Sequence, residues 1–123
     1  MGKLTTHVLD TTLGKPGNAI AVSLFRIDGE QRQSMATVFT NDDGRCDQPL
    51  LEGDSFHASV YELVFAVGPY FAAQESNVSN DEASTAIRFL DDVVIRFGVS
   101  SPDQHYHVPL LITPYSYSTY RGS

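Results

Sequence analysis

The sequence predicts an all-β fold, a two-sheet β-sandwich of about eight strands with one short helix. Apolar and polar residues alternate along many short segments, which is the period of a strand with one buried face. Turn-forming residues separate these segments at nearly regular intervals, as they do in sandwiches. Stretches long enough for a surface helix lack the i, i+3, i+4, i+7 spacing of apolar residues.

Three predicted strands and their connections fill the first part of the chain. Residues 5–10 form the first strand, and residues 13–17, which contain glycine and proline, form the loop after it. Residues 19–27 alternate through the second strand. The Asp-Gly pair at residues 28–29 favours a tight hairpin turn, so residues 33–40 are expected to pair with that strand.

The middle of the chain combines a turn, a long strand and the predicted helix. Asn-Asp-Asp-Gly at residues 41–44 favours a turn, because these residues tolerate positive φ. The strand at residues 56–66 is expected to end at the Gly-Pro pair of residues 68–69, and residues 69–76 are expected to form the helix. Residues 77–85 are polar and acidic, which predicts a mobile loop.

The last three predicted strands bring the C-terminus into the fold. Residues 93–99 are apolar and β-branched, and a turn at residues 101–103 leads to the strand at residues 105–113. Pro114 separates this strand from the last one, at residues 115–121. Tyrosines and apolar residues continue almost to the final residue, so we expect the chain end to be an ordered part of the fold.

Composition narrows the class of protein. A chain of 123 residues fits a single domain, here residues 1–123. The 15 acidic and 8 basic residues give a net charge of -7 without a Lys/Arg cluster, which argues against nucleic acid or a membrane surface as a partner. The N-terminus shows no apolar signal segment, so we interpret the Asn-Val-Ser sequon at residues 77–79 as a chance match. Cys46 is the only cysteine, which excludes an internal disulfide, and we expect a cytoplasmic protein.

Three histidines are candidates for chemistry. His7 shares a strand face with Thr5 and Leu9, and His105 and His107 share one face of a later strand. Histidine exchanges protons near neutral pH, so this group suits general acid and base catalysis. The alternatives are structural or surface histidines, and a zinc site in which His7 completes the His-x-His pair. The residues alone leave these alternatives open.

Arg45 follows the turn at residues 41–44 and precedes Cys46. Its guanidinium either forms a solvated ion pair with acidic neighbours or binds a planar anionic or imide group through two hydrogen bonds. We interpret Cys46 as a small buried residue, with a thiolate activated by the neighbouring cation as the alternative. The chain has no glycine-rich phosphate loop, GxSxG elbow or HExxH helix, which excludes the commonest phosphoryl-transfer, serine-hydrolase and zincin sites.

Three separated segments resemble the motifs of one known family, the transthyretin-related proteins. HYHVPLLITPYSYSTYRGS at residues 105–123 is similar to the C-terminal signature of this family. LTTHVLDTTLGKPG at residues 4–17 resembles its N-terminal motif, and TNDDGR at residues 40–45 resembles its central motif. The ending YRGS at residues 120–123 is the feature that separates the hydrolase members from the carrier transthyretin. Residues 71–92 do not match residue by residue.

The resemblance implies a transthyretin-like sandwich of two four-stranded sheets, and a homotetramer with active sites where its two dimers face each other. The implied reaction is the hydrolytic ring opening of 5-hydroxyisourate to 2-oxo-4-hydroxy-4-carboxy-5-ureidoimidazoline in urate degradation, with no cofactor and no metal. The implied catalytic residues are His7, Arg45, His107 and Ser123. The implied substrate-binding residues are Arg45, Tyr120, Arg121 and Gly122, and His105 is given a supporting or structural role.

Ring opening of a cyclic amide requires a base, a stabilised oxyanion and a proton for the leaving nitrogen. Our hypothesis makes neutral His7 the general base, held in its tautomer by the terminal carboxylate or the hydroxyl of Ser123. Arg45 binds the substrate oxygens and stabilises the oxyanion, and His107 positions substrate or water. The alternatives are a transthyretin-like carrier without chemistry, a purely structural sandwich, and a zinc hydrolase built on His7, His105 and His107.

Overall fold

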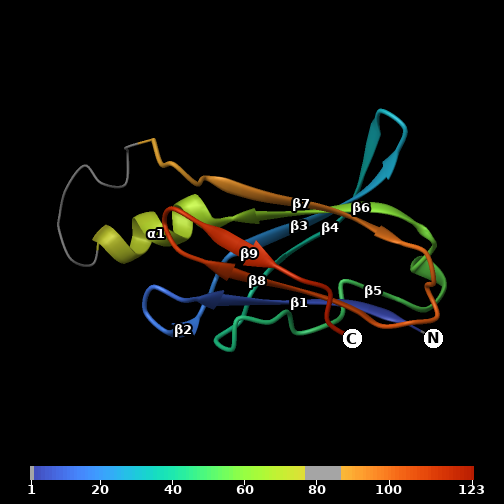
Figure 1. The fold of residues 1–123 in the computed structure, drawn as a ribbon, viewed down its shortest axis with the longest axis horizontal. Helices are drawn as coiled ribbons and strands as arrows, with labels where there is room; N and C mark the ends of the chain where they lie inside the picture. The colour runs from blue at the N-terminus through green and yellow to red at the C-terminus, as the bar shows by residue number, and fades with distance from the viewer. Residues whose placement is uncertain (1, 77–86) are drawn as a thin grey trace.

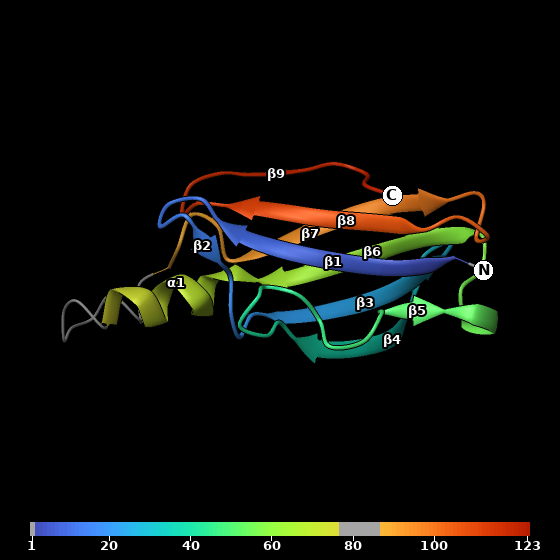
Figure 2. The same ribbon diagram turned by 90° about the horizontal axis from the view of Figure 1, so that it is seen from below.

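The computed structural model describes residues 2–76 and 87–123, which form two β-sheets packed face to face. One α-helix lies at the end of the sandwich opposite the two termini (Figures 1 and 2). This architecture confirms the predicted all-β sandwich with one short helix. The loop expected at residues 77–85 and the sequon at residues 77–79 lie outside the described residues.

The first sheet has the order β2-β1-β8-β9, and β5 also pairs with β1. Its strands are β1 (Lys3–Asp10), β2 (Lys15–Pro16), β5 (Leu51–Glu52), β8 (Tyr106–Ile112) and β9 (Tyr117–Thr119). β1 and β8 are parallel, whereas the other pairs are antiparallel. In the described part of the chain the sheet therefore has five strands rather than the four that the resemblance implied, and two of them, β2 and β5, are only two residues long.

The second sheet is antiparallel throughout, with the order β4-β3-β6-β7. Its strands are β3 (Ala21–Asp28), β4 (Gln31–Phe39), β6 (Ser59–Ala66) and β7 (Asp92–Val99). The register between β3 and β4 shifts between Leu24 and Phe25. β3 and β4 form the predicted hairpin, whose turn contains Gly29 at a φ of 63°.

The core lies between the sheets and follows the alternation in the sequence. β1 shows the pattern clearly, because Leu4, Thr6, Val8 and Asp10 are buried while the residues between them face outward. Asp10 accepts a hydrogen bond from the hydroxyl of Tyr70 at 2.7 Å, which attaches the helix to the first sheet. The largest fully buried side chains are Tyr61, Phe65, Leu4, Ile20, Leu24, Leu63, Leu110, Ile112, Val8, Val22, Val67 and Val93.

Several element boundaries differ from the sequence prediction. β6 starts at Ser59 rather than residue 56, because a 3₁₀ turn, η1 (Gly53–Ser55), precedes the buried ring of Phe56. β9 is only three residues long, because Thr113 and Ser116 close a turn in which the Thr113 amide donates to the Ser116 carbonyl at 2.9 Å. Helix α1 (Val67–Ser76) starts two residues early, and its proline falls in the first turn, where proline is tolerated.

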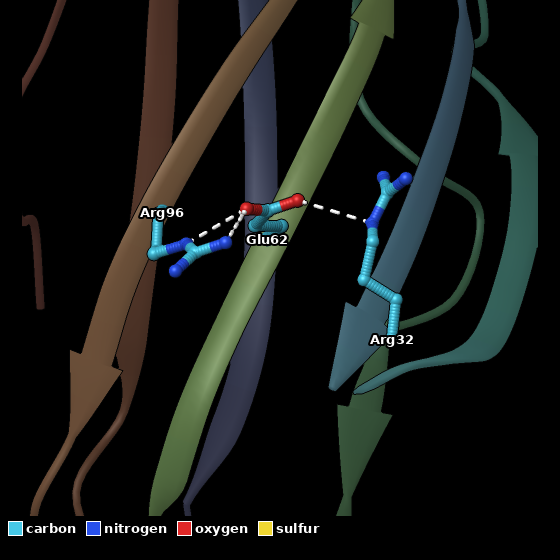
Figure 3. A network of polar contacts seen from close by, with 3 residues as sticks. All are labelled: Arg32, Glu62 and Arg96. Carbon is cyan, nitrogen blue, oxygen red and sulfur yellow. Dashed lines mark hydrogen bonds and ion pairs between the residues drawn. The ribbon is translucent and has the colours of Figure 1, made fainter. Parts of the chain in front are cut away.

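A charged cluster occupies the outer face of the second sheet (Figure 3). Glu62 of β6 is only 7% exposed and lies between Arg96 of β7 and Arg32 of β4. Arg96 donates from Nε at 2.7 Å and from Nη2 at 2.6 Å to Oε2, and Arg32 Nε lies 3.3 Å from Oε1. The cluster therefore links three strands.

In the described part of the chain, no helix is long and apolar enough to cross a bilayer.

Candidate active site

Main-chain hydrogen bonds attach the turn at residues 41–45 to the edge of β1. The side-chain oxygen of Asn41 accepts hydrogen bonds from the amides of Asp43 and Arg45, at 2.9 and 3.1 Å. Gly44 has a φ of 76°, and its carbonyl accepts from the amide of Val8 at 2.8 Å. A Cβ at Gly44 would lie 2.4 Å from the Val8 carbonyl oxygen, so only glycine fits. This attachment forms a β-bridge between Arg45 and His7.

His7 lies on the outward face of β1 with Thr5 and Leu9, as the alternation predicts. Its Nε2 is 3.0 Å from the backbone carbonyl oxygen of Asp43. A carbonyl only accepts hydrogen bonds, so Nε2 carries the proton and the neutral ring has its lone pair at Nδ1. The ring partner that the structure provides is thus the Asp43 carbonyl, in place of the Ser123 group that we expected to fix the tautomer.

His107 lies on β8 at the position that pairs with Thr5 of β1. Its Nδ1 is 2.8 Å from the hydroxyl oxygen of Thr5. Burial lowers the pKa of His107 from its usual value, and the charges of Arg45 and His7 lower it further. Burial and the Arg45 guanidinium also lower the pKa of His7. The two imidazoles and the guanidinium, distant in sequence, therefore interact electrostatically, and both rings favour the neutral form.

The chain end is bound to the same strand. The amide of Gly122 donates to the His107 carbonyl at 2.7 Å, and the His107 amide donates to the Gly122 carbonyl at 3.2 Å. Ser123 directly follows this bridge. A hollow of about 530 Å³ opens here and is lined by Asp103, Gln104, His105, Arg121, Gly122 and Ser123.

Arg121 has contacts that hold the chain end in place. Its Nη2 donates to the side-chain oxygen of Gln104 at 3.1 Å and to the backbone carbonyl of His105 at 3.0 Å. Its guanidinium also lies 4.0 Å from the centre of the Tyr106 ring. These contacts describe a structural role, whereas substrate binding by Arg121 stays a prediction. Tyr120, the neighbouring residue, is 62% exposed.

His105 and Cys46 lie outside the group formed by His7, Arg45 and His107. His105 is exposed and precedes β8, so the strand expected at residues 105–113 begins one residue later. Burial raises the pKa of the Cys46 thiol, and the charge of Asp47 raises it further, which favours the thiol over a reactive thiolate. Within residues 2–76 and 87–123, no group of three or more His, Cys, Asp or Glu side chains is arranged to hold a metal ion.

Sequence reasoning missed Thr5, Asn41 and Asp43 as members of the site. Thr5 was placed on the same strand face as His7, but its contact with His107 depends on the register between β1 and β8. Asn41 and Asp43 were recognised only as turn residues. Their contributions come from one side-chain oxygen and one backbone carbonyl, which leave no separate signal in a sequence.

Comparisons with known proteins identify the family of this chain. Residues 4–122 match the HIUase/Transthyretin family. The 5-hydroxyisourate hydrolase of Pseudomonas aeruginosa is 56% identical over 123 residues, which cover 100% of this chain and 93% of that protein. The structure of Klebsiella pneumoniae 5-hydroxyisourate hydrolase aligns with a TM-score of 0.78 and 31% identity over 100% of both chains. Sea bream transthyretin in complex with thyroxine has the same fold, with a TM-score of 0.81 and 24% identity over 98% of this chain and 94% of that one.

Proposed function

This chain belongs to the HIUase/transthyretin family, and we infer that it hydrolyses 5-hydroxyisourate to 2-oxo-4-hydroxy-4-carboxy-5-ureidoimidazoline in urate degradation. The membership confirms the resemblance of the three sequence motifs. One observation carries the proposal from family to chemistry: backbone bridges join His7 to Arg45 and His107 to Gly122 on the paired strands β1 and β8. A carrier needs shape and apolar contact, whereas two neutral imidazoles beside a guanidinium provide a base and an oxyanion site.

His7 is the general base of the proposed reaction. Its Nδ1 takes a proton from the attacking water, while the Asp43 carbonyl holds the Nε2 proton in place. The water oxygen bonds to the ring carbonyl carbon and gives a tetrahedral oxyanion. As the carbon–nitrogen bond breaks, the His7 imidazolium returns the proton to the leaving nitrogen, so the base is regenerated. General base assistance of this kind accelerates a reaction by about 10²–10⁴.

Arg45 binds the electron-rich oxygens of the substrate and stabilises the oxyanion. Its side chain is exposed, so it is available to a ligand, and the turn at residues 41–45 fixes its backbone. One well-placed donor to an oxyanion is worth about 3 kcal/mol in other enzymes. With a net charge of -7, the protein as a whole does not attract an anionic substrate, which makes this local cation necessary. No cofactor or metal takes part in the proposed reaction.

The active enzyme is proposed to be a cytoplasmic homotetramer with its active sites at the dimer–dimer interface. His7 and His107 lie on the first sheet outside the core, and Arg45 is exposed. A site on an outer face needs a second surface to enclose the substrate and exclude water. The same face of another subunit is the simplest such surface, because a two-fold interface brings identical patches together. Ser123 and Tyr120 then contribute to walls that two subunits share.

The decay of freshly prepared 5-hydroxyisourate, followed in the ultraviolet, tests the function directly. The substrate also decays spontaneously, so a blank without protein is subtracted. Wild-type protein should accelerate the decay, and His107→Asn should reduce turnover by orders of magnitude while keeping the fold. His57→Asn is the matched control, because His57 is an exposed histidine just before β6, a strand of the second sheet. Wild-type protein that leaves the decay rate at the blank value would support a carrier instead.

A further inference from the structure

We propose that Thr5 is a positioning residue for the hydrolysis inferred above, and that its hydroxyl holds neutral His107 with the ring proton at Nε2. His107 then serves as a hydrogen-bond donor to the carbonyl oxygen of the substrate, and His7 serves as the base. The hydroxyl oxygen of Thr5 is 2.8 Å from Nδ1 of His107. This role rests on the proposed function and adds a residue to its site.

The backbone places the Thr5 hydroxyl accurately. The parallel register of β1 and β8 pairs Thr5 with His107 and His7 with Pro109. Thr5 and His7 therefore lie on the same outward face of β1, two residues apart. A β-branched residue in a strand has few χ1 rotamers, so the threonine hydroxyl loses little freedom when it binds the ring.

The chemistry of the partner decides the tautomer of His107. A carboxylate only accepts, so it would require a proton at Nδ1 and would favour the charged ring. A hydroxyl can donate or accept, and we infer that the Thr5 hydroxyl donates, because among the described residues this ring nitrogen is its hydrogen-bond partner. Donation to Nδ1 leaves the proton of the neutral ring at Nε2, the nitrogen that does not face Thr5. Burial and two neighbouring cationic or basic groups favour that neutral ring, since they lower the pKa of His107.

The two histidines then have complementary roles. His7 presents a lone pair at Nδ1, because its Nε2–H is bound to the Asp43 carbonyl. His107 presents an N–H, and a neutral imidazole of this kind can polarise a carbonyl in other enzymes. Together with Arg45, the Nε2–H of His107 gives the developing oxyanion two donors from different strands and turns. If His107 carried its proton at Nδ1 instead, the site would present two basic ring nitrogens to the substrate and one hydrogen-bond donor fewer.

Nuclear magnetic resonance tests the tautomer without any substrate. Protein labelled with ¹⁵N-histidine gives long-range proton–nitrogen correlations for each ring, and the His107 signals are those that vanish in His107→Asn. We expect an unprotonated Nδ1 and a protonated Nε2 at neutral pH. A protonated Nδ1 would overturn the assignment. Because no substrate is present, this result does not depend on whether the protein hydrolyses 5-hydroxyisourate.

Kinetics tests the positioning role. Thr5→Val keeps the shape of the side chain and removes the hydroxyl, so kcat should fall about tenfold while KM changes little, as expected for one hydrogen bond to the ring. Thr5→Ser restores the hydroxyl and should recover most of kcat. Thr37→Val is the matched control, because Thr37 is an exposed strand threonine on the second sheet.

Two kinetic outcomes would overturn the proposal. Wild-type kcat in Thr5→Val would show that the hydroxyl has no role, and a Thr5→Ser variant as slow as Thr5→Val would assign the loss to packing. If Thr5→Val does not fold, the resonance measurement on the wild-type protein still decides whether Nδ1 of His107 is unprotonated. Wild-type protein without hydrolase activity would refute the proposed function alone, since the tautomer of His107 would still be measured.

Discussion

Replacing Gly122 with alanine should reduce turnover about tenfold and change stability by no more than about 1 kcal/mol. Gly122 forms the two-hydrogen-bond bridge to His107, with distances of 2.7 and 3.2 Å. Its φ lies outside the left-handed region, so the backbone itself accepts alanine. The new Cβ, however, would lie 3.2 Å from both Cβ and Cδ2 of His107.

The magnitude follows from that contact. A separation of 3.2 Å between carbon atoms is too short, so the ring or the chain end must shift by a few tenths of an ångström. A displacement of about 1 Å at a catalytic group can reduce a rate about 10²-fold, so a few tenths correspond to about tenfold. The longer bond of the bridge is the one that would weaken, and a single hydrogen bond contributes about 1 kcal/mol to stability.

Turnover is measured from the ultraviolet decay of 5-hydroxyisourate after subtraction of the blank, and stability from urea unfolding. Gly98→Ala is the matched control, because Gly98 also lies in a strand region and an added Cβ there meets nothing within 4 Å. Unchanged turnover in Gly122→Ala would refute the claim that the bridge sets the position of the His107 ring. A loss of turnover in proportion to unfolded protein would also refute it.

Four further predictions concern pH, metal and the second sheet. Because the pKa values of His7 and His107 are both lowered, both rings stay neutral as the pH falls to 6.5, so kcat/KM should stay constant down to this pH and decrease only below it. A midpoint at or above pH 6.5 in the pH–rate profile would contradict this. The unfolded chain binds more protons at these sites below pH 6.5, so the free energy of unfolding from urea titrations should decrease as the pH falls through that value. Turnover should survive prolonged dialysis against EDTA, and loss that zinc restores would favour the zinc hydrolase. Glu62→Gln should lower the free energy of unfolding by about 1–2 kcal/mol, because Arg32 and Arg96 lose their charged partner, and kcat should not change. If the variant unfolds at the same urea concentration as the wild-type protein, the charged cluster does not contribute to stability.

Alternation and turn residues were sufficient to predict the main strands and the faces of β1. The pattern of β1 follows directly from its sequence, because a strand with one buried face repeats every two residues. The hairpin of β3 and β4 was predictable for a similar reason, since Asp28 and Gly29 suit its turn. The two-residue strands β2 and β5 gave no such signal, because two residues are too few to show an alternation.

The site was predictable only in part. The motifs identified His7, Arg45 and His107, but the orientation of each ring depends on groups that belong to the fold. Asp43 acts through its backbone carbonyl, and Thr5 acts through the register of two strands that are about a hundred residues apart in sequence. Arg121 shows the same limit, because its contacts with Gln104 and His105 depend on the fold, while substrate binding by its side chain stays a prediction.

Main-chain pairing, rather than side-chain packing, gives this site its geometry. One bridge joins His7 to Arg45, a second joins His107 to Gly122, and the parallel register joins Thr5 to His107. Main-chain hydrogen bonds are insensitive to the side chains on the outer face, so these side chains can change without loss of the fold. Sea bream transthyretin, whose structure contains thyroxine, shares this fold at 24% identity, which fits a scaffold that accepts different chemistry on its surface. In the proposed site, hydrolysis therefore depends on a few outward side chains, and their positions depend on hydrogen bonds that the whole sandwich maintains.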